Sequence, residues 1–270
     1  MWGYMRMELN RAFYNMKFFL AFSAAMGICV WHFVENVLPL GQYVNAGDYP
    51  HSVFCKWIGG ESASIQQTLY YFIILVFCAV PYGKTFYFDA KSGFIVQLIT
   101  RGEKKAYLVA KFICSFLTGA VIAVVPLVFN FLLSNTVMPS IMPQSGIGFF
   151  PLGDYSLMGG LFYTHPFLYL FWYLLMNAAF FGMFNMISLW AVSFVRNGFW
   201  IVLMPFLSYT FIFCLTRFVG KTGFSPISFL RPNQPYGSEG WIILLEFLVL
   251  LGLNLFFFVW YQKKEKINYE

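Results

Sequence analysis

The chain carries little charge for its length. Only 10% of its 270 residues are Asp, Glu, Lys or Arg, whereas 60% are hydrophobic and 22% are aromatic. A soluble domain needs roughly 25% charged residues to cover its surface, and a chain this apolar would expose patches large enough to aggregate in water. The composition therefore excludes an ordinary soluble domain and predicts an integral membrane protein.

Residues and motifs of common catalytic and metal sites are scarce as well. Of five cysteines only Cys55 lies outside the long apolar runs, so no disulfide framework is expected. Three histidines occur without an HExxH motif or a set of metal ligands. Residues 60–63 read Gly-Glu-Ser-Ala and lack the last glycine of a nucleophile elbow. The sequence predicts no catalytic residue, no metal site and no cofactor held by this chain.

A nucleotide-binding loop is also missing. Such a loop needs GxxxxGK[ST], because successive backbone amides cradle the phosphates and the lysine reaches the β and γ positions. Segments 83–85 and 220–222 both read Gly-Lys-Thr, but Cys78 and Leu215 stand where the first glycine is required. We therefore expect no ATP site and no Mg²⁺ site in this polypeptide.

Long apolar runs dominate what is present. A bilayer core of about 30 Å requires roughly 20 mainly apolar residues per helix. Six segments qualify, at approximately 18–38, 65–82, 107–133, 166–194, 199–219 and 241–261. No internal repeat or low-complexity tract is evident, so we predict one domain over residues 1–270. Its expected fold is an all-α membrane protein with six transmembrane helices.

Basic residues are unevenly shared between the two sides of the predicted bundle. Cytoplasmic loops retain Lys and Arg. With the N-terminus inside, thirteen of the seventeen basic residues face the cytoplasm, and only Lys56, Arg217, Lys221 and Arg231 face outward. We therefore predict that both termini are cytoplasmic. The net charge of +6 is then a topology signal, and no soluble basic module that would bind nucleic acid is present.

Residues 1–17 form an amphipathic segment. Its apolar residues follow helical spacing, and its polar residues fall mostly elsewhere; the apolar set is Trp2, Met5, Leu9, Ala12, Phe13 and Met16, and the polar set is Arg6, Glu8, Asn10, Arg11 and Asn15. A basic, aromatic helix of this kind lies along the membrane interface. We assign Trp2, Arg6 and Arg11 to this contact with lipid. The alternative is that the segment only extends the first span.

The densest cluster of charge lies in residues 91–111, between the second and third predicted spans. Apolar residues recur there at helical spacing between two glycines, in the order Gly93, Phe94, Ile95, Leu98, Ile99 and Gly102. A charged turn follows, made of Arg101, Glu103, Lys104 and Lys105. A short amphipathic helix with a charged rim suits docking into a groove on a soluble partner. The alternative is a solvated loop whose basic side chains lie at the lipid headgroups.

This order of elements resembles the type-2 ABC transporter permease, the membrane subunit of many bacterial exporters. That family shows an acidic residue, a glycine, a Leu-rich turn, a basic turn and a lysine that opens the third span. Matching residues occur here in order, namely Asp89, Gly93, Leu98, Arg101, Lys105 and Lys111. The sequence departs from the family pattern at two places. The family often has a proline in the basic turn, near the place of Gly102 here, and a glycine before the final lysine, where this chain has Ala110.

The resemblance implies that residues 93–105 form a cytoplasmic coupling helix. In the family this helix sits in a cleft of a separate ABC ATP-binding subunit, which holds the ATP and Mg²⁺. The resemblance assigns coupling to Asp89, Gly93, Leu98, Arg101, Glu103, Lys104 and Lys105. It also implies that the chain pairs as a homodimer or with a similar second permease. The expected location is the bacterial plasma membrane, which the chain would cross several times. The chain itself would not be an enzyme.

Polar groups inside the spans are candidates for a transport pathway. An ionisable group at mid-bilayer costs about 2.5–3.5 kcal/mol or more, and Glu246 in the last span is the clearest case. It could contact cationic cargo, pair with Arg217 or Arg231, or lie near the headgroups. Three polar residues share one side of the fourth span and either line a pathway or tie helices together; they are Asn177, Asn185 and Ser188.

The resemblance therefore implies the permease subunit of an ATP-driven exporter. By analogy with that family, its expected cargo is a peptide, such as an antimicrobial or toxin peptide, or another amphiphilic molecule. One alternative is an ion-coupled secondary transporter, which would need more buried acidic groups and internal repeats. Another is a membrane scaffold or sensor that transports nothing and binds no ATPase.

Overall fold

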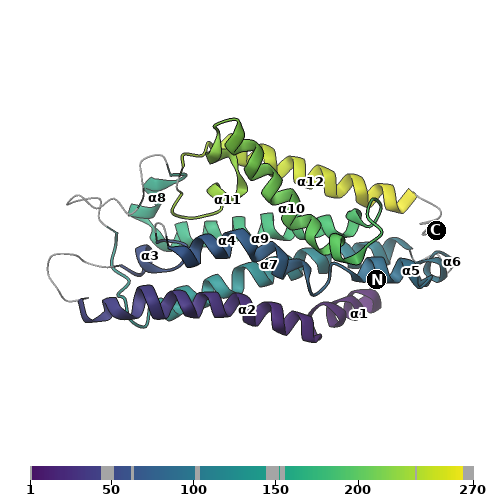
Figure 1. Cartoon of the computed structure of the whole chain (residues 1–270), viewed down its shortest axis with the longest axis horizontal. Helices are drawn as coiled ribbons and strands as arrows, with labels where there is room; N and C mark the ends of the chain where they lie inside the picture. The colour runs from purple at the N-terminus through teal and green to yellow at the C-terminus, as the bar shows by residue number, and fades with distance from the viewer. Residues whose placement is uncertain are drawn as a thin grey trace.

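The chain folds as a bundle of long apolar helices. The computed structural model describes residues 2–43, 52–61, 64–100, 104–143, 152, 156–234 and 236–263, and these contain helices and no strand (Figure 1). Five helical segments are long and apolar enough to cross a membrane; they are Met16–Tyr43, α7 (Lys104–Ser134), α9 (Pro166–Ala191), α10 (Gly198–Phe218) and α12 (Gly240–Lys263). The architecture is that of an all-helical, multi-pass membrane protein, as predicted.

The second predicted span corresponds to a shorter helix. Helix α4 (Ile65–Ala79) has 15 residues, and its three expected last residues, 80–82, lie in the turn that follows. At 1.5 Å per residue α4 extends about 22 Å, less than a bilayer core of about 30 Å. The count of six spans therefore stays a prediction that depends on α4.

The first long segment changes its helical form along its length. It runs as α2 (Met16–His32), the π-helix η1 (Phe33–Val37) and the 3₁₀-helix η2 (Leu38–Tyr43). The remaining elements are short and lie between or before the long helices; they are α1 (Trp2–Phe13), α3 (Val53–Lys56), α5 (Thr85–Lys91), α6 (Phe94–Thr100), α8 (Gly159–Thr164), η3 (Thr222–Phe224) and α11 (Pro226–Phe229).

Local residue choice sets where several helices begin. Asn15, Ser64 and Asn197 precede α2, α4 and α10, and each side chain accepts a hydrogen bond from a backbone N–H of the first turn, the usual role of these residues at helix starts. Pro166 opens α9, where the missing N–H costs nothing. Because Asn15 starts a new helix, α1 is separate from α2 and does not extend it.

Helices α7 and α9 form the centre of the bundle. Helices α2 and α4 pack on α7, whereas α10 and α12 pack on α9 (Figure 1). The two central backbones approach closely at Gly119, where an added Cβ would lie 2.7 Å from the Asn185 Cβ. Small residues allow such approaches between helices in membranes.

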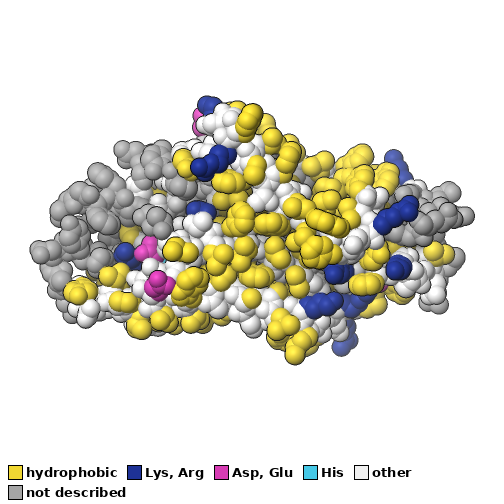
Figure 2. Space-filling view, viewed as in Figure 1, with side chains coloured by type: hydrophobic (Ala, Val, Ile, Leu, Met, Phe, Trp, Pro, Cys, Tyr) yellow, Lys and Arg dark blue, Asp and Glu magenta, His cyan; other side chains and the backbone are white. Residues whose placement is uncertain are grey.

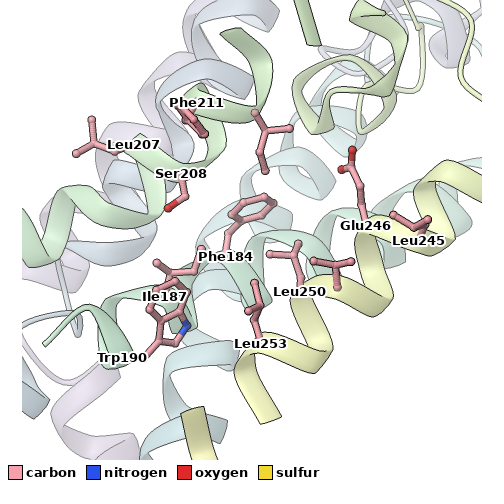
Figure 3. A pocket seen from close by; sticks show the side chains of 12 residues that line it. Phe184, Ile187, Trp190, Leu207, Ser208, Phe211, Leu245, Glu246, Leu250 and Leu253 are labelled. Atoms are coloured by element: carbon pink, nitrogen blue, oxygen red, sulfur yellow. The ribbon is translucent and has the colours of Figure 1, made fainter. Parts of the chain in front are cut away.

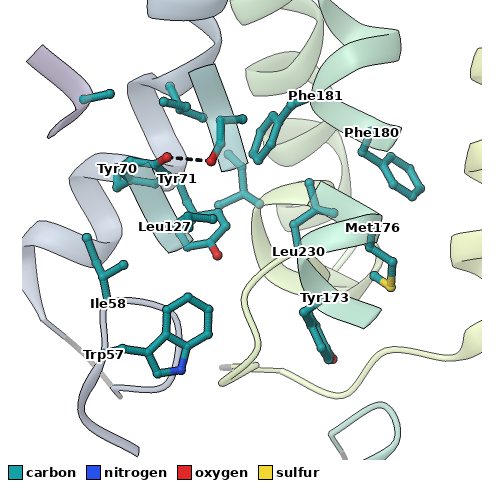
Figure 4. Close-up of a cluster of buried hydrophobic side chains, with 14 of the residues drawn as sticks. Trp57, Ile58, Tyr70, Tyr71, Leu127, Tyr173, Met176, Phe180, Phe181 and Leu230 are labelled. Carbon is teal, nitrogen blue, oxygen red and sulfur yellow. Dashed lines mark hydrogen bonds between the residues drawn. The ribbon is translucent and has the colours of Figure 1, made fainter. Parts of the chain in front are cut away.

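Buried tyrosines tie the outer helices to this centre. The Tyr70 hydroxyl of α4 donates to the Ala123 carbonyl of α7 at 2.6 Å (Figure 4). The Tyr209 hydroxyl of α10 donates to the Tyr71 carbonyl at 3.0 Å. A buried hydroxyl without such a partner would cost free energy, so these bonds remove that cost for Tyr70 and Tyr209.

One end of the bundle carries the short helices α5 and α6. The start of α1 and the end of α12 lie at the same end, whereas α3, α8 and α11 lie toward the other (Figure 1). The Lys104 ammonium donates to the Gln262 carbonyl at 3.4 Å, which joins the start of α7 to the end of α12 there. Figure 2 shows Lys and Arg side chains gathered at this end on the face in view.

Candidate functional site

A network of buried charges lies beneath α5 and α6. Arg11 of α1 forms a two-pronged ion pair with Asp89 of α5, through Nη2 to Oδ1 at 2.7 Å and Nη1 to Oδ2 at 3.0 Å. Its Nη1 also donates to Glu8 Oε1 at 3.0 Å, one turn earlier in α1. Planar guanidinium groups favour this geometry with carboxylates. Two segments 78 residues apart are thereby joined.

Lys111 of α7 completes the network. Its Nζ lies 2.7 Å from Asp89 Oδ2 and 2.8 Å from Glu8 Oε2, and its side chain is fully buried. The Tyr82 hydroxyl donates to Glu8 Oε2 and the Tyr107 hydroxyl donates to Asp89 Oδ2, both at 2.6 Å. The lysine ammonium also lies over both tyrosine rings, at 4.9 and 5.5 Å from the ring centres.

The network balances its charges. Two cations face two carboxylates, and the tyrosine hydroxyls donate to the same two carboxylate oxygens that Lys111 contacts, which adds the hydrogen bonds that a buried ionic cluster requires. Burial alone would raise the pKa of Asp89, but the hydrogen bonds from Arg11 and the charge of Lys111 hold this pKa below its ordinary value. The four charged residues therefore act as one unit.

Helices α5 and α6 form an elbow, residues 85–100, that turns at Gly93. This glycine has a φ of +76° with no atom within 4 Å of an added Cβ, a backbone conformation that side chains disfavour. On α6, Ile95 and Leu98 are buried against Tyr107 and its apolar neighbours, whereas Val96 is 59% exposed. The predicted helix after Gly93 is present, and its apolar face packs on the bundle itself.

The residues predicted for coupling take different positions. Asp89 and Leu98 are buried and anchor the elbow, and Lys105 is exposed at the start of α7. Arg101 and Glu103 lie outside the described residues. Those predicted for the interfacial helix also differ, because Trp2 and Arg6 are exposed whereas Arg11 enters the network.

The predicted polar seam of α9 is buried inside the protein. Asn185 donates to the Ser115 carbonyl of α7 at 2.8 Å, and Asn177 donates to the Leu230 carbonyl at 3.0 Å. The Ser188 hydroxyl donates to the Asn185 carbonyl of its own helix at 2.8 Å. The two asparagine bonds tie α9 to its neighbours, and a role of the three residues in a pathway stays a prediction.

Glu246 lies at a groove between α10 and α12. Its Oε2 atom is buried without a hydrogen-bond partner among the described residues. The predicted pairs with Arg217 or Arg231 are not formed, since neither cation lies within 4 Å of the carboxylate. The Arg231 guanidinium instead lies over the Tyr71 ring, 5.8 Å from its centre.

The sequence pattern does not indicate most of the buried network. Its helical spacing groups Glu8 with the polar residues of the N-terminal helix, yet Glu8 is fully buried. Lys111 belongs to the basic residues that the charge bias assigns to the cytoplasmic side, although it falls inside the predicted span 107–133. A lysine four residues into an apolar run is the signal that could have found the site, because such a residue needs a buried partner.

A second buried polar cluster lies toward the other end of the bundle. His32 Nε2 is 2.7 Å from Glu61 Oε2, and Asn130 of α7 donates to the Cys29 carbonyl at 2.8 Å. The side-chain Oδ1 of Asn130 accepts a hydrogen bond from the Ile58 backbone N–H at 2.8 Å. This cluster fastens the segment around α3 to α2 and α7.

Comparison with known proteins adds no relative. A scan of protein-family models and searches of curated proteins and of solved structures find no match for this chain. The resemblance to a permease family therefore stays a prediction from the residues quoted for it.

Proposed function

We propose that this chain is the membrane permease subunit of an ATP-driven exporter and that the α5–α6 elbow docks on a separate ATP-binding subunit. In this proposal α4 is the sixth span, both termini are cytoplasmic, and the chain works as a homodimer or beside a second permease in a bacterial plasma membrane. One observation carries it: a buried ion pair fastens the elbow at the basic end to α7, a helix long enough to cross a membrane.

The ion pair between Asp89 and Lys111 would couple movement of the elbow to movement of α7. Asp89 is on α5, and its partner Lys111 is on α7, whose 31 residues extend about 46 Å. Separating a buried pair leaves an uncompensated charge and costs about 3–5 kcal/mol. A displacement of α5 is therefore expected to move the adjoining part of α7 with it.

The exposed side of the elbow offers the docking surface. Val96 points away from the bundle, and Lys91, Ser92 and Gln97 are exposed beside it. An apolar side chain within a polar rim suits a groove on a soluble protein. The predicted contact therefore shifts from Leu98, which is buried, to Val96 on the opposite side of α6.

The partner would supply the free energy and this chain the pathway. Closure of two ATP-binding subunits would press on both elbows and change which side of the bundle is open. A ligand moves such an equilibrium only by its different affinity for the two states. The cargo proposed from the sequence remains a peptide or another amphiphilic molecule.

Two glycines provide a matched test. Gly93 in the elbow and Gly220 after α10 both have a φ of +76° and open space around an added side chain. Tryptophan at either position strains the backbone in the same way, but only Gly93→Trp places bulk at the proposed docking surface. We expect the wild type and Gly220→Trp to co-purify with an ATP-binding protein of roughly 25–30 kDa, a size typical of one domain, and Gly93→Trp to lose it.

The test has clear opposing results. Insertion and thermal stability should be similar for the two variants, because the added strain is the same. Equal retention of an ATPase by both variants would remove the docking role from the elbow. A wild-type protein that carries no ATPase at all would contradict the proposed function itself.

A second candidate is a proton-coupled secondary transporter. The observation that favours it is a pair of buried carboxylates, Glu8 and Asp89, facing Lys111, since buried acidic groups often relay protons in carriers. Transport into vesicles driven by a pH gradient without ATP would support this candidate over the exporter.

A further inference from the structure

We propose that the groove between α10 and α12 binds a cationic single-chain amphiphile, with its ammonium head at Glu246 and its apolar chain running toward Trp190. Figure 3 shows the two helices facing each other across the groove, with side chains of α9 between them. Binding of the amphiphile in this groove does not depend on the proposed exporter function. The inference that the bound amphiphile is transported cargo does rest on that function.

The groove has the size and lining of a ligand site. Its volume is about 660 Å³, within the roughly 300–1,000 Å³ of small-molecule sites. Leu207 and Phe211 line one wall, Leu250 and Leu253 the other, and Phe184 of α9 the floor (Figure 3). Such walls suit a hydrocarbon chain.

Glu246 gives the groove its charge preference. Among the described residues it is the one ionisable residue that lines the groove, and its Oε2 atom is shielded from solvent and has no partner there. A buried acceptor left without a donor costs free energy. The nearby Ser208 hydroxyl donates its hydrogen bond to the Met204 carbonyl at 2.9 Å and not to the carboxylate. An ammonium group supplies both the missing hydrogen bond and the opposite charge.

A second unmatched polar atom marks the far part of the groove. The indole Nε1 of Trp190 is buried and has no acceptor among the described residues. The groove extends about 10 Å along α12, since its lining residues Glu246 and Leu253 are seven residues apart on that helix. Trp190 stacks on Phe257 with ring centres 4.6 Å apart, which fixes the indole in place. It is therefore a suitable reporter for a chain that enters the groove.

The test uses fluorescence quenching in the purified full chain in nanodiscs. The probe is a hexadecylammonium chain with a nitroxide at mid-chain, and its comparison is a hexadecanoate chain with the same nitroxide. The signal from Trp190 is the difference between wild type and Trp190→Phe. We expect saturable quenching by the ammonium probe, with an apparent affinity roughly tenfold or more above that of the carboxylate probe, as one charge-assisted hydrogen bond provides.

Two variants make the result specific. Glu246→Gln should lower the apparent affinity for the ammonium probe roughly tenfold. Glu239 is an exposed glutamate before α12, and Glu239→Gln should leave this affinity unchanged. Val249→Trp should block the groove for both probes while leaving the Glu246 carboxylate in place. Matching elution volumes and melting temperatures would show that the variants are folded.

Three outcomes would overturn the proposal. Equal quenching by both probes with no effect of Glu246→Gln would show that ordinary lipid chains fill the groove. Absence of quenching together with a change of oligomeric state in Val249→Trp would show that a second copy of the chain covers it. Preference for the carboxylate probe would assign the groove to anions. None of these results depends on whether an ATPase co-purifies.

Discussion

Replacement of Lys111 by methionine tests the buried network. The side chain is fully buried, and its ammonium lies 2.8 Å from Glu8 and 2.7 Å from Asp89. Methionine keeps much of the volume but leaves two carboxylates with one cation, Arg11. Removing one partner of a buried ion pair costs about 3–5 kcal/mol. At about 2–4 °C per kcal/mol for a chain of this size, the melting temperature should fall by roughly 6–20 °C.

The assay is intrinsic fluorescence during thermal unfolding in nanodiscs. Lys105→Met is the matched control, because Lys105 is exposed on the same helix and a surface change of this kind costs at most about 0.5 kcal/mol. The double variant Lys111→Met with Asp89→Asn should recover part of the loss, since Glu8 and Arg11 remain as a balanced pair at 3.0 Å. A melting temperature for Lys111→Met as high as that of Lys105→Met would refute the network's role.

Three other predictions concern stability. Because the pKa of Asp89 is lowered in the folded state, the stability this residue contributes is present above about pH 4 and is lost as the pH falls; Asp89→Asn should therefore flatten the acid side of a melting-temperature profile. Gly119→Ala should destabilise by about 1–3 kcal/mol through overpacking against α9, whereas Gly27→Ala, with nothing within 4 Å, should be neutral or stabilising in the same thermal assay. Asn130→Leu should cost about 1–3 kcal/mol because the buried Ile58 N–H loses its acceptor, and the exposed Asn135→Leu should cost far less. Equal losses within either pair would contradict these reasons.

Local pattern predicted the long helices well. Apolar runs of bilayer length mark α7, α9, α10 and α12, whose ends differ from the expected ones by no more than three residues. Helix α4 also ends within three residues of its predicted limit, just before Val80 and Pro81, because a proline has no N–H to continue the helical hydrogen bonds.

Long-range contacts were beyond the sequence pattern. Arg11 and Asp89 are 78 residues apart, and nothing in either segment indicates that they meet. Helical spacing assigned Glu8 to a polar face, because it measures amphipathicity along one helix and not the charge on a neighbour. The cost of an ionisable group in a span singles out Glu246, whose buried Oε2 atom has no hydrogen-bond partner among the described residues. The same reasoning applied to Lys111 would have located the network.

The docking of the elbow can be measured most directly by photo-crosslinking. A benzophenone amino acid is placed at Val96, 59% exposed on α6, and in a control at Phe218, 92% exposed at the far end of α10. Illumination of native membranes should attach an azido-ATP-labelled protein to the chain from position 96 and not from position 218. Labelled adducts from both positions, or from neither, would contradict the proposal that α5–α6 receives the ATP-binding subunit.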